Sequence, residues 1–246
     1  MSNICLITST GIKNNLRSKI VLIVYIIVLL ICASAVVISI SILAIQPELD
    51  KEQPDKLILE RYLGVIVYST SLITIGIYFN SFAFKSLTRE KSRGIIASLL
   101  AAPLTAKDIW LGKSLAIFIP ALIFGEAFTL IVLIILNYIY FIPGTGFLIN
   151  PWIALSSFLA APLIYFCLSL MTHLIGLTGK PASANVIVNI FLPVIVSLSI
   201  NLAMQNILDI NSWSFTAANL GIAAIIFIIT IPLLRRLTNE NIVLSG

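Results

Sequence analysis

The stretch IVLIVYIIVLLICASAVVISISILAI, from Ile20 to Ile45, contains no charged residue. A bilayer core about 30 Å thick is crossed by a helix of roughly 20 apolar residues, so this stretch is long enough to span a membrane. The whole chain of 246 residues is similarly apolar, with 59% hydrophobic and 10% charged residues, unlike an ordinary soluble domain. The sequence therefore predicts an all-α, polytopic membrane protein.

Apolar runs of comparable length, bounded by charged or turn residues, recur along the chain. They cover Ile20–Ile45, Tyr62–Phe84, Ile109–Tyr140, Trp152–Leu177, Asn185–Leu208 and Trp213–Leu234. We expect each run to form one transmembrane helix, which gives six spans in a single transmembrane domain over residues 1–246. The third run is overlong, and Pro120 is expected to bend it or to separate a leading interfacial segment from it.

The segment before the first run, residues 1–19, mixes apolar and basic side chains. Ile4 and Ile7 share it with Lys13, Arg17 and Lys19. A helix of this kind is suited to lie in the plane of the lipid headgroups, with its apolar side toward the acyl chains. We therefore predict an amphipathic interfacial helix at the N-terminus.

Basic residues fall unequally on the two sides of the predicted membrane. If both termini are cytoplasmic, one side collects the following residues: Lys13, Arg17, Lys19, Lys85, the basic residues of the segment 88–113, Lys180, Arg235 and Arg236. Only Lys51, Lys56 and Arg61 fall outside. The positive-inside rule thus predicts that both termini lie in the cytoplasm. We expect a multi-pass protein of the cell membrane, most simply a prokaryotic plasma membrane. Anionic lipid accounts for the net charge of +5, so no nucleic-acid partner is expected.

A charged segment, TREKSRGIIASLLAAPLTAKDIWLGK, lies between the second and third runs and covers residues 88–113. Residues 88–102 carry apolar side chains at helical spacing, which predicts a helix along the cytoplasmic membrane surface that ends at Pro103. Thr105 and Asp108 then form a capping-box pattern before the next run. Physical reasoning leaves two interpretations equally open: an ordinary basic connector, or an element that docks a partner.

The residue order of this segment resembles a known family. It contains Arg89-Glu90, Gly94, Leu99-Leu100, Pro103-Leu104-Thr105 and Gly112-Lys113. This order is similar to the cytoplasmic motif of type-2 ATP-binding-cassette (ABC) transporter permeases. The resemblance implies that the segment contains a coupling helix that contacts a separate ATPase subunit. The implied coupling residues are Arg89, Glu90, Gly94, Leu99, Leu100, Pro103 and Thr105.

The same resemblance implies an assembly and a function. Two six-span subunits and two ATPase subunits would form an exporter, with ATP and Mg²⁺ bound by the partner and no cofactor in this chain. The chain departs from the family where Ile95 and Ile96 replace the frequent Thr-Leu, and its last outer connection, around residues 205–214, is short. The subfamily is therefore open, and the haem-export subunit of cytochrome c maturation is an alternative. The exported substrate is open as well, and lipids, peptides, drugs and haem all fit the apolar spans.

Polar residues within two spans are candidates for a translocation pathway. They are Tyr68, Ser71 and Thr74 in the second run, and Asn189, Ser197, Asn201 and Gln205 in the fifth. Hydrogen bonding between helices uses the same residue types and contributes about 0.6 kcal/mol per contact. The residues alone leave packing and pathway equally open, and the resemblance favours the pathway, because spans two and five line the central route in that family.

Glu126 is the one acidic residue well inside a predicted span. A charge at mid-bilayer costs about 2.5–3.5 kcal/mol, so this carboxyl is expected to face protein or water. Two roles are open: a neutral hydrogen-bonded contact between helices, or a proton or ion site. The second role would suit a different class of protein, a secondary transporter driven by an ion gradient.

Catalytic and metal-binding patterns are not recognised in the sequence. Cys5, Cys32 and Cys167 are scattered, which supports neither a zinc site nor a disulfide framework. The stretch GLTGK, residues 176–180, lacks the glycine and the hydroxyl residue that a phosphate-binding loop requires at Leu174 and Pro181. We therefore expect no catalytic residue and no ATP hydrolysis in this chain, which also counts against a membrane-embedded enzyme.

Overall fold

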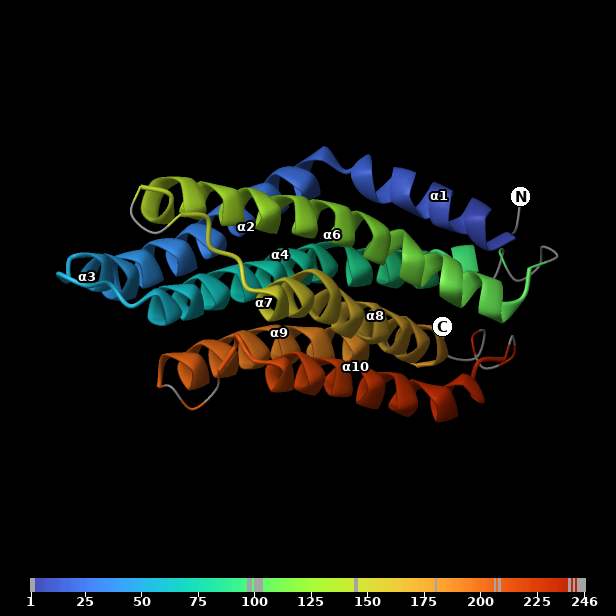
Figure 1. Ribbon diagram of the computed structural model, residues 1–246. Helices are drawn as coiled ribbons and strands as arrows, with labels where there is room; N and C mark the ends of the chain where they lie inside the picture. Colours follow the sequence, from blue (N-terminus) through green and yellow to red (C-terminus); the bar gives the residue numbers. More distant parts are fainter. Residues whose placement is uncertain are drawn as a thin grey trace.

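The computed structural model describes residues 3–96, 99, 104–143, 146–179, 181–205, 207, 209–238, 240 and 242. Of residues 83–89, 92, 181–183, 185, 192, 203 and 204 it describes the backbone but not the side chains. Throughout the described part every regular element is helical and no strand occurs, which confirms the all-α prediction. The helices form one elongated bundle (Figure 1).

The helices follow the apolar runs of the sequence. In chain order they are α1 (Asn3–Leu16), α2 (Lys19–Ile40), α3 (Gln46–Leu49), α4 (Lys56–Ser92), α6 (Ala106–Leu136), α7 (Pro151–Leu155), α8 (Ala161–Thr178), α9 (Pro181–Met204) and α10 (Trp213–Leu234). Three π-helical turns occur in the described chain: η1 (Ser41–Ile45) between α2 and α3, η2 (Asn137–Phe141) at the end of α6, and η3 (Ser156–Ala160) between α7 and α8. These turns continue the helices that they join, so the longer apolar runs form continuous rods.

Five helices of the described chain are long and apolar enough to cross a membrane. They are Lys19–Leu49, Lys56–Phe82, Ala106–Phe141, Pro151–Thr178 and Trp213–Leu234. These helices coincide with five of the six predicted runs. Their length and apolar composition are those of a multi-pass membrane protein. The helix α9 covers most of the remaining run. The side chains of several of its residues are not described, and it is not among these five helices, so the sixth span stays a prediction.

Pro120 does not divide the third run. The helix α6 continues from Ala106 to Leu136 with Pro120 inside it, and no interfacial segment is split from its beginning. Of the two alternatives expected at Pro120, the division of the run is therefore wrong, and a bend stays a prediction. A proline removes one backbone hydrogen bond, and the neighbouring helices can compensate for that loss in a packed bundle.

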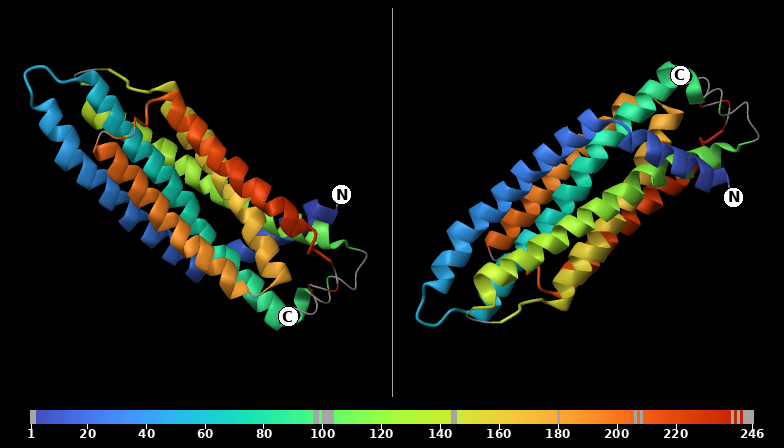
Figure 2. Two further views of the ribbon diagram at one scale, coloured as in Figure 1. Left: turned by 90° about the horizontal axis from the view of Figure 1, so that it is seen from below. Right: turned by 90° about the horizontal axis from the view of Figure 1, so that it is seen from above.

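The connections gather at the two ends of the bundle (Figures 1 and 2). One end holds α1, the connection from α4 to α6, the junction of α8 with α9, and the C-terminal end of α10. The other end holds α3, the end of α6 and the connection from α9 to α10. Both termini therefore lie at the same end, as the prediction requires, while the assignment of that end to the cytoplasm remains a prediction.

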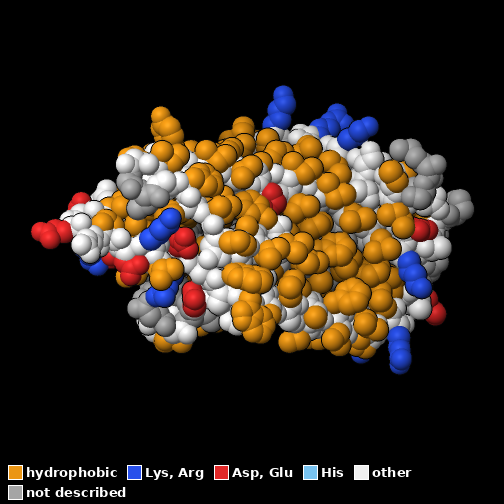
Figure 3. Space-filling model, in the orientation of Figure 1, with side chains coloured by type: hydrophobic (Ala, Val, Ile, Leu, Met, Phe, Trp, Pro, Cys, Tyr) orange, Lys and Arg blue, Asp and Glu red, His pale blue; other side chains and the backbone are white. Residues whose placement is uncertain are grey.

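The outer surface of the bundle is apolar along most of its length. Figure 3 shows hydrophobic side chains over the middle of one face, with charged side chains toward its ends and along its upper edge. Large exposed apolar residues are frequent on α2 and α10, for example Ile23, Ile31, Ile225 and Ile228. A surface of this kind suits lipid, because its apolar side chains need no hydrogen-bond partner and a helix bonds its backbone groups internally.

The helix α4 is the central element. Its residues Leu63, Ile66, Leu72 and Phe79 are fully buried, and it packs against α2, α6, α8 and α9. Aromatic rings join it to α2, where Tyr25 meets Tyr78 edge-on at 5.2 Å between centroids. The second predicted span is thus the core of the bundle and not a lipid-facing helix.

The N-terminal helix α1 crosses the end of the bundle and packs on the first half of α6 (Figure 2). Two glycines permit this crossing. A Cβ added to Gly11 would lie 2.6 Å from Cβ of Ala116, and one added to Gly112 would lie 2.7 Å from Cγ2 of Ile7. The hydroxyl of Thr8 donates to the carbonyl of Gly112 at 3.3 Å. The predicted N-terminal helix is therefore present over residues 3–16, held against α6 by close backbone approach.

Candidate functional site

The candidate site is the end of the bundle at which the chain passes from α4 to α6. The sequence predicts a separate surface helix over residues 88–102, but α4 runs without interruption to Ser92. Gly94 then has a φ of 68°. A left-handed glycine directly after a helix is a common stop signal, because a residue without Cβ adopts this conformation at little cost. The predicted start of the surface helix is therefore wrong, and residues 88–92 belong to the central helix.

Glu90 and Lys113 form an ion pair across this end. The ammonium of Lys113 lies 2.6 Å from Oε1 of Glu90, and the two side chains are 15% and 14% exposed. Glu90 lies in the last turn of α4 and Lys113 in the third turn of α6. Since both charges are largely removed from water, their pairing fixes the position of one helix end against the other.

A second polar contact joins α4 to the junction of α8 with α9. The Lys91 ammonium donates to the carbonyl oxygen of Gly179 at 2.7 Å. Partial burial lowers the pKa of Lys91. The end of α4 is thus attached on one side to α6 and on the other to the connection that follows α8.

An apolar cluster closes the same end of the bundle. It consists of Ile96, Ala106, Trp110, Leu170, Leu174, Leu177, Leu237 and Ile242. The indole of Trp110 also donates from Nε1 to the carbonyl oxygen of Leu170 at 2.8 Å. The cluster brings together Ile96 of the α4–α6 connection, α6, α8 and residues near the C-terminus, so the described beginning of the connection is anchored to the bundle.

The restart of the chain at α6 has the predicted cap. Oγ1 of Thr105 accepts from the amide of Asp108 at 3.1 Å, and Oδ2 of Asp108 accepts from the amide of Thr105 at 3.1 Å. Both halves of a capping box are therefore present, and the prediction for these two residues is confirmed. The cap satisfies amide groups that a helix beginning would otherwise leave unbonded.

Most of the exposed charged residues described at this end are basic, and Glu240 is an exposed acidic residue beside them. Arg93, Ile95, Lys107, Arg235 and Arg236 are exposed. Ile95 shows 40% of its surface, whereas its neighbour Ile96 is buried in the apolar cluster. We call these five exposed residues the basic end surface. It can meet an acidic surface of a soluble protein or the anionic headgroups of a membrane.

The predicted coupling residues have different surroundings. Gly94 is exposed, Leu99 is half-buried, and Glu90 faces Lys113 within the bundle. The side chain of Arg89 and the whole of Leu100 and Pro103 lie outside the described residues. Glu90, one of the implied coupling residues, therefore makes its ion pair with Lys113 of the same chain.

The predicted pathway residues of α4 are buried among helices. The hydroxyl of Tyr68 donates to Oδ1 of Asn219, and that of Ser71 donates to the carbonyl of Ser157 at 2.8 Å. The hydroxyl of Thr74 bonds to the carbonyl of Ser71 in its own helix at 3.1 Å. These groups hold α4 against α10 and η3, and the side chains of Tyr68, Ser71 and Thr74 are fully buried.

The predicted pathway residues of α9 lie on the outer surface of the bundle. Asn189, Ser197, Asn201 and Gln205 are all exposed on the outside of the bundle. The amide of Asn201 donates to the carbonyl of Ser197, one turn earlier on the same helix, at 2.8 Å. The single chain therefore does not bring the two predicted sets together: the α4 set faces inward and the α9 set faces outward.

Glu126 is half-buried on α6 and points toward the polar groups of α4. Its Oε1 lies 3.5 Å from the hydroxyl of Ser71, which is a long contact. Its Oε2 is buried and has no hydrogen-bond partner within the described residues, and the same is true of Oγ of Ser157. An unsatisfied carboxyl oxygen beside a buried hydroxyl marks this position as a second candidate site.

Neither a metal cluster in the described residues nor a comparison with known proteins indicates a function. Within the described ranges, no three His, Cys, Asp or Glu side chains lie close enough to hold a metal ion. The chain matches no model of a known protein family, no characterised protein and no solved structure. Its function is therefore argued from its own residues.

Sequence reasoning missed the residues that anchor the site. Trp110 and Lys91 carry contacts to α8 and its junction with α9, and neither was expected to do so. Lys113 was recognised only as part of a motif, although it neutralises Glu90. A signal was available, since an acidic and a basic residue flank a connection that must bring two apolar helices side by side.

Proposed function

We propose that this chain is the membrane-spanning permease subunit of an ABC exporter. It would pair with a second copy of itself and with a separate subunit that hydrolyses ATP. The support is the anchored connection between α4 and α6, which presents the basic end surface outward while Glu90, Lys91 and Ile96 tie it to the rest of the bundle. A partner that moves this connection would therefore move helices and not a loose loop.

The length of the central helix α4 would allow it to transmit a movement from one side of the membrane to the other. The helix α4 runs from Lys56 to Ser92, so its docking end and its opposite end belong to one continuous rod. A helix of this length spans about 55 Å at 1.5 Å per residue, which exceeds the thickness of a bilayer core. A tilt imposed at the docking end would reach the far side of the membrane through α4 and the helices packed on it.

A second copy is required for a pathway in this proposal. The polar residues of α9 face outward, and polar groups that face lipid are unfavourable unless protein or water covers them. Two chains that meet near α9 would enclose these residues between them. The exported molecule would then pass between subunits, and its chemical class stays open.

The experiment tests docking at the basic end surface. The double variant Arg93→Glu/Lys107→Glu reverses two exposed charges of that surface, and Lys19→Glu changes an exposed charge on α2 outside it. Tagged permease is co-purified with the ATPase encoded beside its gene, and ATP hydrolysis is measured in lipid nanodiscs. We expect the double variant to lose the ATPase and its permease-dependent hydrolysis, and Lys19→Glu to retain both. Equal retention by all three proteins would refute the proposal.

Glu126 supports a second candidate function, a transporter driven by an ion gradient. The supporting observation is its buried, unsatisfied Oε2, on a carboxyl whose other oxygen, Oε1, lies 3.5 Å from the hydroxyl of Ser71. Purified permease in liposomes, given a proton gradient and no ATPase, would then carry a proton flux that Glu126→Gln abolishes. An absent flux in the wild-type protein would remove this candidate and leave the first unaffected.

A further inference from the structure

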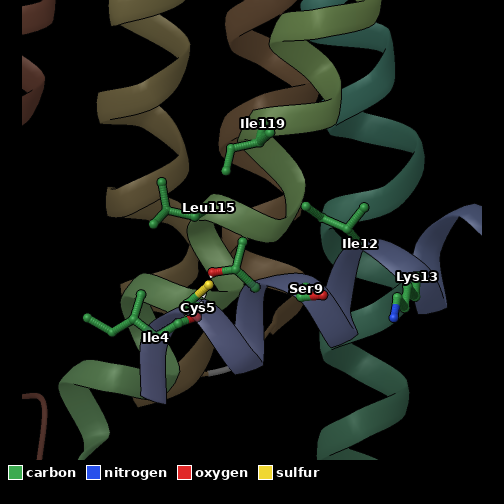
Figure 4. Close-up of a pocket in the computed structure, with 8 residues that line it drawn as sticks. Ile4, Cys5, Ser9, Ile12, Lys13, Leu115 and Ile119 are labelled. Atoms are coloured by element: carbon green, nitrogen blue, oxygen red, sulfur yellow. Dashed lines mark hydrogen bonds between the residues drawn. The ribbon is translucent and has the colours of Figure 1, made fainter. Parts of the chain in front are cut away.

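A groove lies in the corner between α1 and α6, at the end of the bundle that carries the termini. Its volume is about 520 Å³. The residues that decide its character are Ile4, Ile12 and Lys13 of α1 with Leu115 and Ile119 of α6. Figure 4 shows α1 running across the course of α6, with Leu115 and Ile119 on one side of it and Lys13 near its far end.

The groove has two chemically distinct parts. Leu115 and Ile119 are one turn apart on α6, so they form an apolar strip that leads from α1 toward the middle of the bundle. Lys13 is exposed and places a positive charge at the rim. Thr8 also borders the groove, but its hydroxyl is already bonded to the carbonyls of Ile4 and Gly112.

The position of the groove in the bundle indicates that its ligand is a membrane lipid. The surrounding bundle surface is apolar and includes helices long enough to span a membrane, so the groove opens toward lipid. Molecules of the bilayer have an acyl chain that fits an apolar strip and a headgroup that stays at the level of an interfacial helix. A lysine at that level attracts anionic headgroups, and each basic residue near a membrane surface contributes about 1 kcal/mol, or roughly fivefold in affinity.

We propose that the groove between α1 and α6 binds one anionic phospholipid. Its acyl chain lies along Leu115 and Ile119, and its phosphate group pairs with Lys13. The bound lipid fills the corner left where Gly11 and Gly112 bring the two helices together, and it thereby stabilises the crossing of α1 on α6. The site is independent of ATPase docking and of the exported molecule.

The test measures lipid binding to delipidated permease in detergent by native mass spectrometry. The probes are dioleoyl phosphatidylglycerol, dioleoyl phosphatidylcholine and glycerol 3-phosphate. We expect one phosphatidylglycerol to bind about fivefold more tightly than phosphatidylcholine, whose acyl chains are the same. Glycerol 3-phosphate is expected to bind weakly, because it lacks the chain that the apolar strip accepts. Equal binding of the two lipids, or tight binding of glycerol 3-phosphate, would overturn the proposal.

Variants separate this groove from general attraction of lipid to basic residues. Lys13→Gln is expected to reduce phosphatidylglycerol binding to the phosphatidylcholine level, whereas Lys19→Gln, which changes an exposed lysine outside the groove, is expected to leave it unchanged. Ile119→Trp fills the apolar strip and is expected to weaken binding of both lipids. Since a tryptophan could disturb folding, thermal unfolding is recorded for each variant. Folded variants that all bind like the wild type, or equal losses in the two lysine variants, would refute the lipid site.

Discussion

The ammonium of Lys113 lies 2.6 Å from Oε1 of Glu90 and joins the end of α4 to the beginning of α6. Glu90 lies in the last turn of α4, where the negative end of the helix dipole disfavours a carboxylate. The pair with Lys113 offsets this unfavourable position. The charged residues that border the connection are therefore partners of each other, and they set its geometry.

The pair can be tested by exchanging its charges. Glu90→Ala leaves the Lys113 ammonium largely buried with its partner removed, and we expect a loss of about 1–3 kcal/mol in the free energy of unfolding. The exchange Glu90→Lys/Lys113→Glu restores opposite charges and is expected to recover most of this loss. Thermal unfolding in detergent measures both. A charge exchange that is as unstable as Glu90→Ala would show that the pair does not join the helices.

The crossing of α1 on α6 gives a prediction about two glycines. Gly11→Ala places a Cβ 2.6 Å from that of Ala116, so α1 must shift, at an expected cost of about 1–3 kcal/mol. Gly221 on α10 is the matched control, because a Cβ there meets no atom within 4 Å. Gly221→Ala is expected to be neutral or slightly stabilising, since alanine favours a helix. Equal thermal stability of the two variants would contradict the close crossing.

The capping box predicts a local effect at the beginning of α6. Thr105→Ala removes the hydroxyl that accepts from the amide of Asp108, and such losses cost about 1 kcal/mol. Hydrogen exchange is expected to quicken in the first turn of α6. Thr178→Ala serves as the control, because within the described residues that hydroxyl bonds to the carbonyl of Leu174 in its own helix. First-turn exchange at the wild-type rate in Thr105→Ala would disprove the role of the cap.

The outward polar face of α9 predicts an effect on self-association. Asn201→Leu/Gln205→Leu removes two exposed polar groups, each expected to contribute about 0.6 kcal/mol to contacts with a second copy. We expect a smaller dimer fraction in light scattering at a fixed protein-to-detergent ratio. Val194→Leu changes an exposed apolar residue of the same helix and serves as the control. A dimer fraction unaffected by the double variant would place the self-contact elsewhere on the chain.

Several features of this protein follow from the sequence alone. The apolar runs predict the helices because burial in lipid depends on the summed hydropathy of a continuous stretch. The run Trp213–Leu234 coincides with α10. The capping box of Thr105 and Asp108 is predictable for a related reason, since both partners lie within one helical turn. These interactions need no information about distant parts of the chain.

Tertiary structure decided the partners of the polar residues. Ser71 on α4 faces inward and Asn201 on α9 faces outward, although both are polar residues within apolar runs. Glu90 meets Lys113, and Gly11 meets Ala116, because of how the helices rotate and cross. Rotation and crossing depend on the packing of several helices at once, and a one-dimensional pattern of apolar residues leaves them undetermined. The sequence by itself thus determined the five long apolar helices and the cap of α6, and packing decided which side chains became a core, an ion pair or an outer surface.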